Sequence, residues 1–134
     1  VTIGIPTSED SFVAFIKVNA IPYKYDQIYK EADLYIVKKG NRLGMFSSEC
    51  KRMSRCKYDR IKFDDKSNFF FVENRFEKTG IYSSSGKKII PCKYKKIELI
   101  ENETNNYFKA KISDNQYEYF SITGKKLPQI RVNN

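Results

Sequence analysis

Basic side chains recur at regular intervals along this 134-residue chain, and anion binding is the chemistry that they could do. The formal net charge is +9, from 25 basic and 16 acidic residues. Four sets of equivalent positions carry the pattern: Lys51, Lys87 and Lys125; Arg52, Lys88 and Lys126; Lys24, Lys57 and Lys93; and Gln27, Arg60 and Lys96. If these positions stack in the fold, they form a basic stripe that suits a polyanion, either nucleic acid or an acidic cell-envelope polymer. The alternative is that the lysines protect exposed strand edges from association.

The candidate contact residues are the basic residues of the two central repeats. They are Lys51, Arg52, Arg55, Lys57, Arg60, Lys87, Lys88, Lys93 and Lys96. A repeat array exposes a long face because each unit contacts mainly its neighbours. We therefore expect a non-enzymatic module or scaffold that presents this face to a protein partner. Polyanion binding by the same stripe and an architectural role within a larger protein are the alternatives. We predict that reversing the charges of Arg60 and Lys96 together weakens partner binding while the fold is kept.

Catalytic and cofactor chemistry find little support among the residues. The chain has no histidine, so neither a Ser-His nor a Cys-His pair can form. Asp26 and Asp59 occupy equivalent positions, where the third repeat has Lys95, and this is typical of turn or edge residues. The three cysteines include no Cys-x-x-Cys pair, so we expect no metal site, no cofactor and no enzyme activity. Cys56 and Cys92 are equivalent, and they either fill apolar core positions or form a disulfide.

A phrase of Lys-Tyr, two polar residues and Ile occurs three times. It indicates the repeat units that position the basic side chains. It covers residues 24–28, 57–61 and 93–97, with the tyrosines 33 and 36 residues apart. A second phrase at 44–51 recurs at 80–87 and, more loosely, at 118–125. A spacing in the thirties indicates tandem repeats. The predicted units of a single domain over 1–134 are 1–33, 34–69, 70–107 and 108–134. In the first unit Ser11 replaces the glycine of the second phrase, and the last unit ends before its Lys-Tyr phrase.

The hydrophobic runs within these units predict an all-β fold. Aromatic and β-branched residues dominate the runs that open the units, namely Leu34–Val37, Phe69–Val72 and Tyr107–Ala110. Turns are predicted at 40–41, 85–87, 114–115 and 123–125, and polar joints between units at 64–68 and 101–106. Each unit of about 35 residues is expected to hold roughly three short antiparallel strands, with the Lys-Tyr phrase on the third. Tyr25, Tyr58 and Tyr94 are expected in the core, and an aromatic binding surface is the alternative.

The sequence gives no sign of a membrane span. No stretch approaches the roughly 18 apolar residues that crossing a bilayer requires, and no signal peptide is visible. The chain begins at Val1 rather than Met, so we expect that an N-terminal segment has been removed or lies outside this sequence. A bacterial cell envelope and a cytoplasmic location both stay open.

The combined phrases resemble the WG-repeat family of bacterial proteins over essentially the whole chain. The third unit is the most similar, through Gly80–Tyr82, Ser85–Lys87 and Ile90–Tyr94. The family's tryptophan before the glycine is absent, and its place is taken by Leu43, Thr79 and Tyr117, while Glu118 replaces the glycine in the last unit. The resemblance implies tandem β-rich units, often attached to larger proteins, with no catalytic residues. Such units form either a partial propeller or an open curved array, and the truncated last unit favours the open array.

Overall fold

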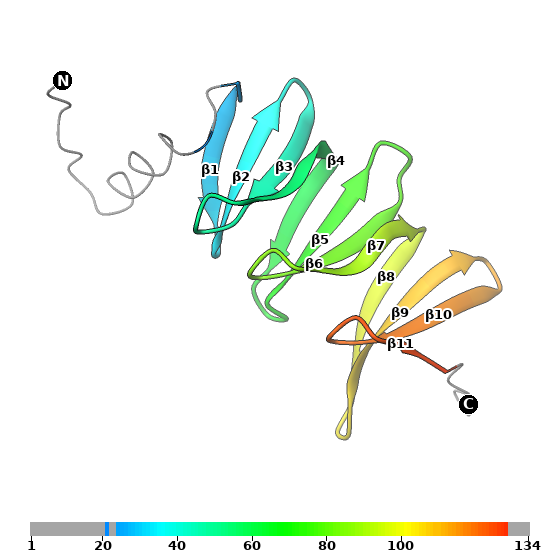
Figure 1. Ribbon diagram of the computed structural model, residues 1–134. Helices are drawn as coiled ribbons and strands as arrows, with labels where there is room; N and C mark the ends of the chain where they lie inside the picture. The colour runs from blue at the N-terminus through cyan, green and yellow to red at the C-terminus, as the bar shows by residue number, and fades with distance from the viewer. Residues whose placement is uncertain (1–20, 22–23, 129–134) are drawn as a thin grey trace, which may run out of the picture.

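The computed structural model describes residues 21 and 24–128, and all regular secondary structure in that part of the chain is β-strand. The strands are β1 (Gln27–Glu31), β2 (Leu34–Lys39), β3 (Arg42–Phe46), β4 (Arg52–Asp64), β5 (Phe69–Asn74), β6 (Thr79–Ser83), β7 (Lys88–Tyr94), β8 (Lys96–Glu101), β9 (Asn106–Ser113), β10 (Gln116–Ser121) and β11 (Lys126–Leu127). They follow one another along an elongated array, with β1 at one end and β11 at the other (Figure 1). The all-β prediction is confirmed. Ser11 and most of the first predicted unit lie outside the described residues.

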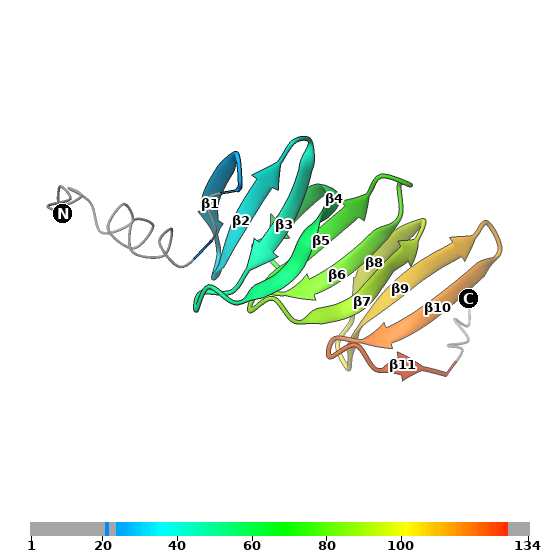
Figure 2. The same cartoon turned by 45° about the horizontal axis from the view of Figure 1, so that its top comes forward.

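The strands belong to two antiparallel sheets, and neither sheet closes on itself. One sheet has the order β1-β2-β3-β4-β5-β6-β7, and the other has the order β11-β10-β9-β8. Figure 2 shows the strands similarly inclined along the whole array. The 13-residue strand β4 pairs with β3 through its first half and with β5 through its second half. In the next part of the chain two strands separated by Lys95 make the equivalent pairings, because β7 pairs with β6 and β8 pairs with β9.

Short hairpins join most neighbouring strands. The turns predicted at 40–41 and 114–115 are confirmed, because Lys39 pairs with Arg42 and Ser113 with Gln116 across two-residue loops. The predicted polar joints at 64–68 and 101–106 are also hairpin connections, which join β4 to β5 and β8 to β9. The strands on either side of each of these polar joints are therefore hydrogen-bonded partners. The predicted unit boundaries at 69/70 and 107/108 fall just inside β5 and β9.

The same strand register follows each Lys-Tyr phrase. The isoleucine of the phrase faces an apolar residue of the next strand in the pairs Ile28↔Val37, Ile61↔Val72 and Ile97↔Ala110. Each of these hairpins is extended by the strand that carries the second phrase, namely β3, β6 or β10. The two recurring phrases therefore occupy equivalent positions in the strand pairing.

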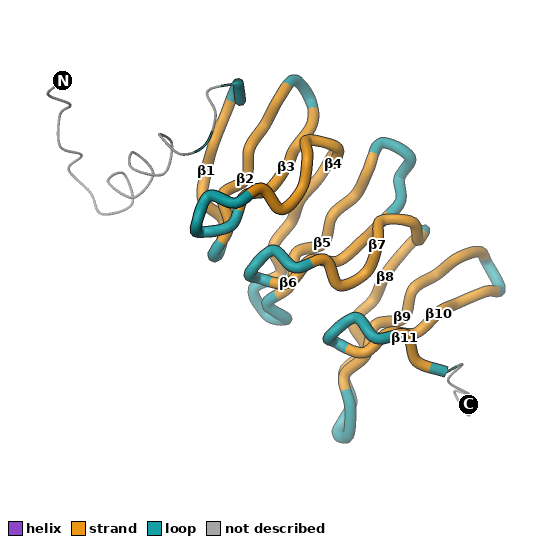
Figure 3. The backbone as a smooth tube through the Cα atoms, in the orientation of Figure 1, coloured by secondary structure: helices purple, strands orange, loops and turns teal. Residues whose placement is uncertain are grey.

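A serine-based turn ends each second phrase. The backbone N–H groups of Ser47, Ser83 and Ser121 donate to the carbonyl four residues later, each at 2.8 Å. Each serine hydroxyl in turn accepts a hydrogen bond from the backbone N–H of that later residue. Gly86 and Gly124 have φ values of 94° and 93°, where glycine is favoured, and Cys50 takes this place at 65°. Figure 3 shows the three loops on the same side of the array.

The core consists of layers of side chains between successive groups of strands. Tyr58 and Tyr94 are 1% and 2% exposed, which confirms their predicted core placement, whereas Tyr25 is only partly buried. Each tyrosine makes an edge-to-face contact with the ring of the second phrase, at centroid distances of 5.7 to 5.9 Å. The pairs are Tyr25–Phe46, Tyr58–Tyr82 and Tyr94–Phe120. Edge-to-face geometry is favoured because the positive ring edge meets the negative ring face.

Candidate functional site

A wide β-bulge in β4 shapes the surface where the basic residues gather. Leu43 pairs with Tyr58 and Met45 with Ser54, so one residue of β3 faces three residues of β4. That single residue is Gly44. A Cβ atom placed there would lie 2.9 Å from the carbonyl carbon of Arg55, so only glycine allows the bulge to approach so closely.

The bulge recurs in β7 with the same count of residues. Thr79 pairs with Tyr94 and Ile81 with Ile90, which leaves residues 91–93 opposite Gly80. A Cβ at Gly80 would lie 2.9 Å from the Cα of Cys92. The glycine of the second phrase therefore has a packing role, and the segment before each Lys-Tyr phrase is the bulged segment that it accommodates.

The central residue of each bulge is a partly buried cysteine. The thiol of Cys56 donates to the Val37 carbonyl at 3.9 Å. The thiol of Cys92 donates to the Lys78 carbonyl at 2.8 Å, and the Val72 carbonyl oxygen lies 3.8 Å from the same sulfur. Burial raises the pKa of both thiols, so both stay protonated and unreactive near neutral pH. Cys56 and Cys92 are thiols rather than partners in a disulfide, which agrees with the interpretation that they fill apolar positions.

One pocket beside the first bulge, of about 320 Å³, carries four cations and is called here the four-cation pocket. It is lined by Lys24, Tyr25, Lys39, Arg52, Arg55 and Cys56. None of these lining residues is acidic. The ammonium group of Lys39 donates to the carbonyl of Lys24 at 2.9 Å. The ammonium group of Lys24 lies 5.6 Å from the centre of the Tyr25 ring. These contacts hold two of the cations in place.

Tyr25 adds a hydroxyl group to the same pocket. Burial raises the pKa of Tyr25, and a hydrogen bond and charge from Arg52 partly oppose that shift. The hydroxyl therefore stays neutral near pH 7, with the guanidinium beside it. A neutral phenol and several cations around one hollow form a site with both charge and a hydrogen-bond donor for an anion.

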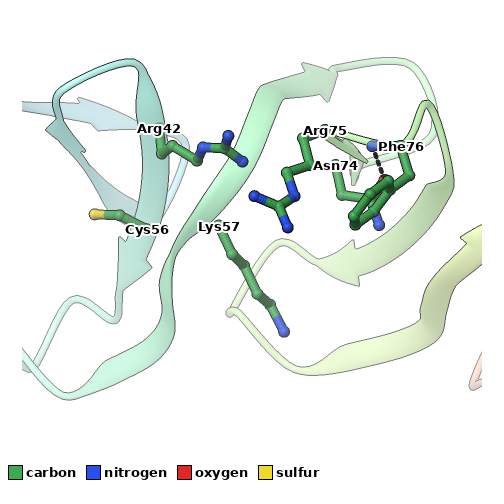
Figure 4. Close-up of a pocket in the computed structure, with 6 residues that line it drawn as sticks. All are labelled: Arg42, Cys56, Lys57, Asn74, Arg75 and Phe76. Atoms are coloured by element: carbon green, nitrogen blue, oxygen red, sulfur yellow. Dashed lines mark hydrogen bonds between the residues drawn. The ribbon is translucent and has the colours of Figure 1, made fainter.

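A second pocket, of about 450 Å³, adjoins the other side of Cys56 and is called here the Arg75 pocket (Figure 4). Its lining residues are Arg42, Cys56, Lys57, Asn74, Arg75 and Phe76. In Figure 4 the guanidinium groups of Arg42 and Arg75 point toward one another, and Lys57 points away from both. Arg75 also lies over the Phe76 ring, 4.7 Å from its centre, and 64% of Phe76 is exposed. An exposed aromatic ring beside arginines is typical of an interaction surface.

The loop that carries Arg75 is held by one side chain. Asn74 Oδ1 accepts hydrogen bonds from the backbone N–H of Phe76 at 2.9 Å and of Lys78 at 3.0 Å. Its amide nitrogen donates to the Cys92 carbonyl in the next bulge at 3.4 Å. The Arg75 pocket is thus tied to the strand framework at both ends.

The nine predicted contact residues divide between these pockets and other surfaces. Three line the pockets: Arg52, Arg55 and Lys57. The other six lie elsewhere: Lys51, Arg60, Lys87, Lys88, Lys93 and Lys96. Arg60 is 3.8 Å from a carboxylate oxygen of Glu73, and Lys96 is 3.7 Å from one of Glu98. These two cations therefore already have anionic neighbours.

Repeat comparison did not select four cations that line the pockets among the predicted contact residues. They are Lys24, Lys39, Arg42 and Arg75. Lys24 belongs to a periodic set but lies outside the central repeats. Lys39 ends β2, and the equivalent end of β5 is Asn74, so no recurrence marks it. Arg42 and Arg75 stand next to hairpin loops of different length. Only the spatial proximity of these loops to the bulge reveals them.

The acidic residues near the site have structural roles. The Asp26 carboxylate accepts a hydrogen bond from the Gly40 N–H at 2.7 Å, and Asp59 lies 3.7 Å from Arg42. Asp26 agrees with the prediction of a turn or edge residue, because it binds the hairpin turn at Gly40. For Asp59 the prediction is wrong, because this residue lies within β4, which pairs with a strand on each side. Over residues 21 and 24–128 no group of three or more potential ligands is placed to hold a metal ion. Within the same residues no helix is long and apolar enough to cross a bilayer.

Comparisons with known protein families, with curated proteins and with solved structures found no match for this chain. The function is therefore inferred from the residues of the two pockets and their geometry.

Proposed function

We propose that this chain is a non-enzymatic interaction module, built as an open array of WG-type β repeats, that binds an acidic segment of a partner protein. The single observation that carries the proposal is the four-cation pocket, whose lining holds four cations and no carboxylate. The recurring registers, bulges and serine turns support the repeat array. Arrays of this kind offer a long exposed face for a partner.

The Arg75 pocket extends the surface in a way that suits a protein. Phe76 offers a large exposed ring, and arginine and aromatic residues are enriched where protein partners bind most strongly. The two pockets meet at Cys56, so one extended segment reaches both. Acidic side chains of that segment pair with the cations, and an apolar side chain covers Phe76.

A short acidic segment fits the charge distribution better than a long polyanion does. Away from the pockets, cations on the strands stand next to carboxylates, as in the pairs Arg60–Glu73, Lys96–Glu98 and Lys126–Glu118. A nucleic acid lying along the whole array would meet these carboxylates and be repelled by them. Polyanion binding remains the second candidate, since the pocket charge alone would also attract nucleic acid.

The test compares binding of a labelled acidic peptide, single-stranded and duplex DNA, and an acidic polysaccharide between roughly 50 and 200 mM salt. The acidic peptide is expected to bind most tightly, with an affinity that falls as salt rises. Replacing two pocket cations, in the variant Arg52→Gln/Arg55→Gln, should weaken peptide binding about tenfold or more. The control variant Lys62→Gln/Lys66→Gln makes the same charge change at exposed sites outside both pockets and should bind like the unaltered protein. Failure of the peptide to bind at the low-salt end would refute the proposal, and tighter binding of DNA would favour the second candidate.

A further inference from the structure

The four-cation pocket is a local feature that the repeat does not require. Its equivalents in the next repeat include Asn74 in place of Lys39 and Pro91 in place of Arg55. The bulge and its cysteine are nevertheless kept there, as Cys92 shows. Lys57 and Lys88 take the places of Lys24 and Arg52, so the equivalent positions hold two cations instead of four. The fold is therefore compatible with fewer cations at this place, and the extra charge at the first bulge needs another explanation.

The cations of this pocket line one hollow and therefore repel one another. Among residues 21 and 24–128, the ion pairs involve other side chains, and none joins Lys24, Lys39, Arg52 or Arg55 to a carboxylate. Lys39 is nevertheless fixed to the Lys24 carbonyl, and Arg52 lies beside the Tyr25 hydroxyl. Three of the four cations therefore have a defined contact within the pocket, and like charges gathered in one hollow favour a ligand of high negative charge.

We propose that the four-cation pocket binds a phosphate monoester carried on a side chain of the partner segment. This inference rests on the proposed function, because it names the group on the acidic segment that the pocket recognises. A phosphate monoester carries close to two negative charges at pH 7 and three acceptor oxygens, whereas a carboxylate or a phosphodiester carries one charge. Two guanidinium groups offer planar pairs of N–H donors that match phosphate oxygens, and two ammonium groups add compact charge. The Tyr25 hydroxyl offers a further donor at the wall of the pocket.

The absence of histidine makes the charge of the ligand easy to examine by pH. Lysine and arginine stay charged from pH 5 to pH 8, and burial raises the pKa values of Tyr25 and Cys56, so these two stay neutral. Histidine, which ordinarily titrates in this range, is absent from the whole sequence. The second ionisation of a phosphate monoester lies near pH 6, whereas carboxylates ionise mainly below pH 5. A change in affinity larger than that of a matching peptide with glutamate in place of the phosphoserine therefore reports the phosphate itself.

The experiment measures binding of three peptides to the full chain, with serine, glutamate or phosphoserine at one central place in the same acidic sequence. The phosphoserine peptide is expected to bind about tenfold or more tightly than the glutamate peptide at about pH 7.5. Its affinity should fall about tenfold between about pH 7.5 and about pH 5, whereas that of the glutamate peptide should change much less. Equal binding of the phosphoserine and glutamate peptides would overturn this inference and leave the proposed function intact. Failure of all three peptides to bind would overturn both.

Two variants and one competitor complete the test. Lys39→Asn introduces the residue that β5 already carries at the equivalent place, so the fold should be kept while the preference for phosphoserine falls. Arg52→Gln/Arg55→Gln should abolish the preference, and the control Lys62→Gln/Lys66→Gln should retain it. Inorganic phosphate should compete only weakly with the phosphopeptide. Competition by inorganic phosphate as strong as that by the phosphopeptide itself would show that the pocket takes a free phosphate, and would overturn the assignment to a protein-borne group.

Discussion

At the scale of single residues, the three tyrosines of the Lys-Tyr phrase have three different partners for their hydroxyl groups. Each ring packs edge to face on the ring of the second phrase, and each hydroxyl has a polar partner. Tyr25 has Arg52, Tyr58 shares a 2.7 Å hydrogen bond with Tyr82, and Tyr94 donates to Glu118 at 2.6 Å. Glu118, which replaces the repeat glycine, therefore has a structural role as the hydrogen-bond acceptor of Tyr94. The sequence alone showed only that the glycine was missing.

The hydroxyl pair of Tyr58 and Tyr82 gives the first prediction. The variant Tyr82→Phe should lower the free energy of unfolding by about 1–3 kcal/mol, because the buried Tyr58 hydroxyl loses its partner. The double variant Tyr58→Phe/Tyr82→Phe should lose less than the sum of the two single changes, since no hydroxyl is then left unpaired. Urea unfolding measures all four proteins, and a fully additive double variant would contradict the account.

Alkaline pH gives a second prediction at the same scale. Burial raises the pKa of Tyr58 and Tyr94 above the ordinary value of 10.0. The hydrogen bond between Tyr58 and Tyr82, and the one that Tyr94 donates to Glu118, add to the two shifts. Each raised pKa contributes stability that is complete below pH 10 and is lost as the pH rises above it, because the unfolded chain then ionises first. Between pH 9 and pH 11 the free energy of unfolding should fall, at up to about 1.4 kcal/mol per pH unit for each such tyrosine.

The matched control for the pH series is the double variant Tyr58→Phe/Tyr82→Phe. This variant lacks both Tyr58 and Tyr82, whose pKa values are raised in the folded protein. Its free energy of unfolding should therefore fall less steeply above pH 10. Parallel curves for the two proteins would show that other groups cause the alkaline loss.

At the scale of the strands, the bulge opposite the repeat glycine is the element that creates the site. The bulge turns Cys56 toward the core and leaves its neighbours Arg55 and Lys57 to line two pockets. The sequence predicted the strands and several turns, because aromatic runs and Gly-Asn or Asp-Asn pairs report local structure directly. It did not predict the bulge, because an extra pair of residues in one strand is defined only by the partner strand.

The close approach at Gly80 gives a third prediction. The variant Gly80→Ala should lower the free energy of unfolding by about 1–3 kcal/mol, because the new Cβ would press on backbone atoms of Cys92 and Ile90 that have no side-chain freedom. Thermal or urea unfolding measures the loss, with Lys66→Ala in an exposed loop as the control that should change little. A neutral Gly80→Ala would mean that the bulge can shift to make room.

At the scale of the whole molecule, stability resides in successive interfaces between neighbouring groups of strands. One cluster joins β5–β7 to β8–β10 through fully buried side chains such as Phe108, whose ring meets that of Phe69 at 5.0 Å. A separate cluster around Tyr58 and Phe70 joins β2–β4 to β5–β7. In the repeat array that we propose, each group of strands is expected to be coupled mainly to its nearest neighbours.

The variant Phe108→Ala provides the fourth prediction. It should cost about 3–5 kcal/mol at its own interface, because a large buried ring is replaced by a cavity. Hydrogen exchange should show the largest loss of protection in β8–β10, a smaller loss in β5–β7 and the least in β1–β3. An equal loss in every strand would instead indicate one fully cooperative unit.

The candidate site was only partly predictable from the sequence. Arg52 and Lys57 were selected because basic residues recur at their positions, and Arg55 because it is a basic residue of the same central repeat. Lys39 and Arg75 were not, because neither belongs to a recurring set and each reaches a pocket from a hairpin end that only the fold brings to the bulge. The recurring phrases therefore predicted the strand framework, whereas residues that do not recur complete the two pockets.

The most direct test of the central claim is a backbone NMR titration of the protein with the acidic peptide. The account predicts that amide signals shift at the two pockets, chiefly at residues 24–25, 39, 52–57 and 74–76, while those of β8–β10 stay in place. Shifts that concentrate on β8–β10, or no shifts with the acidic peptide at low salt, would contradict the claim that the bulge of β4 forms a binding surface.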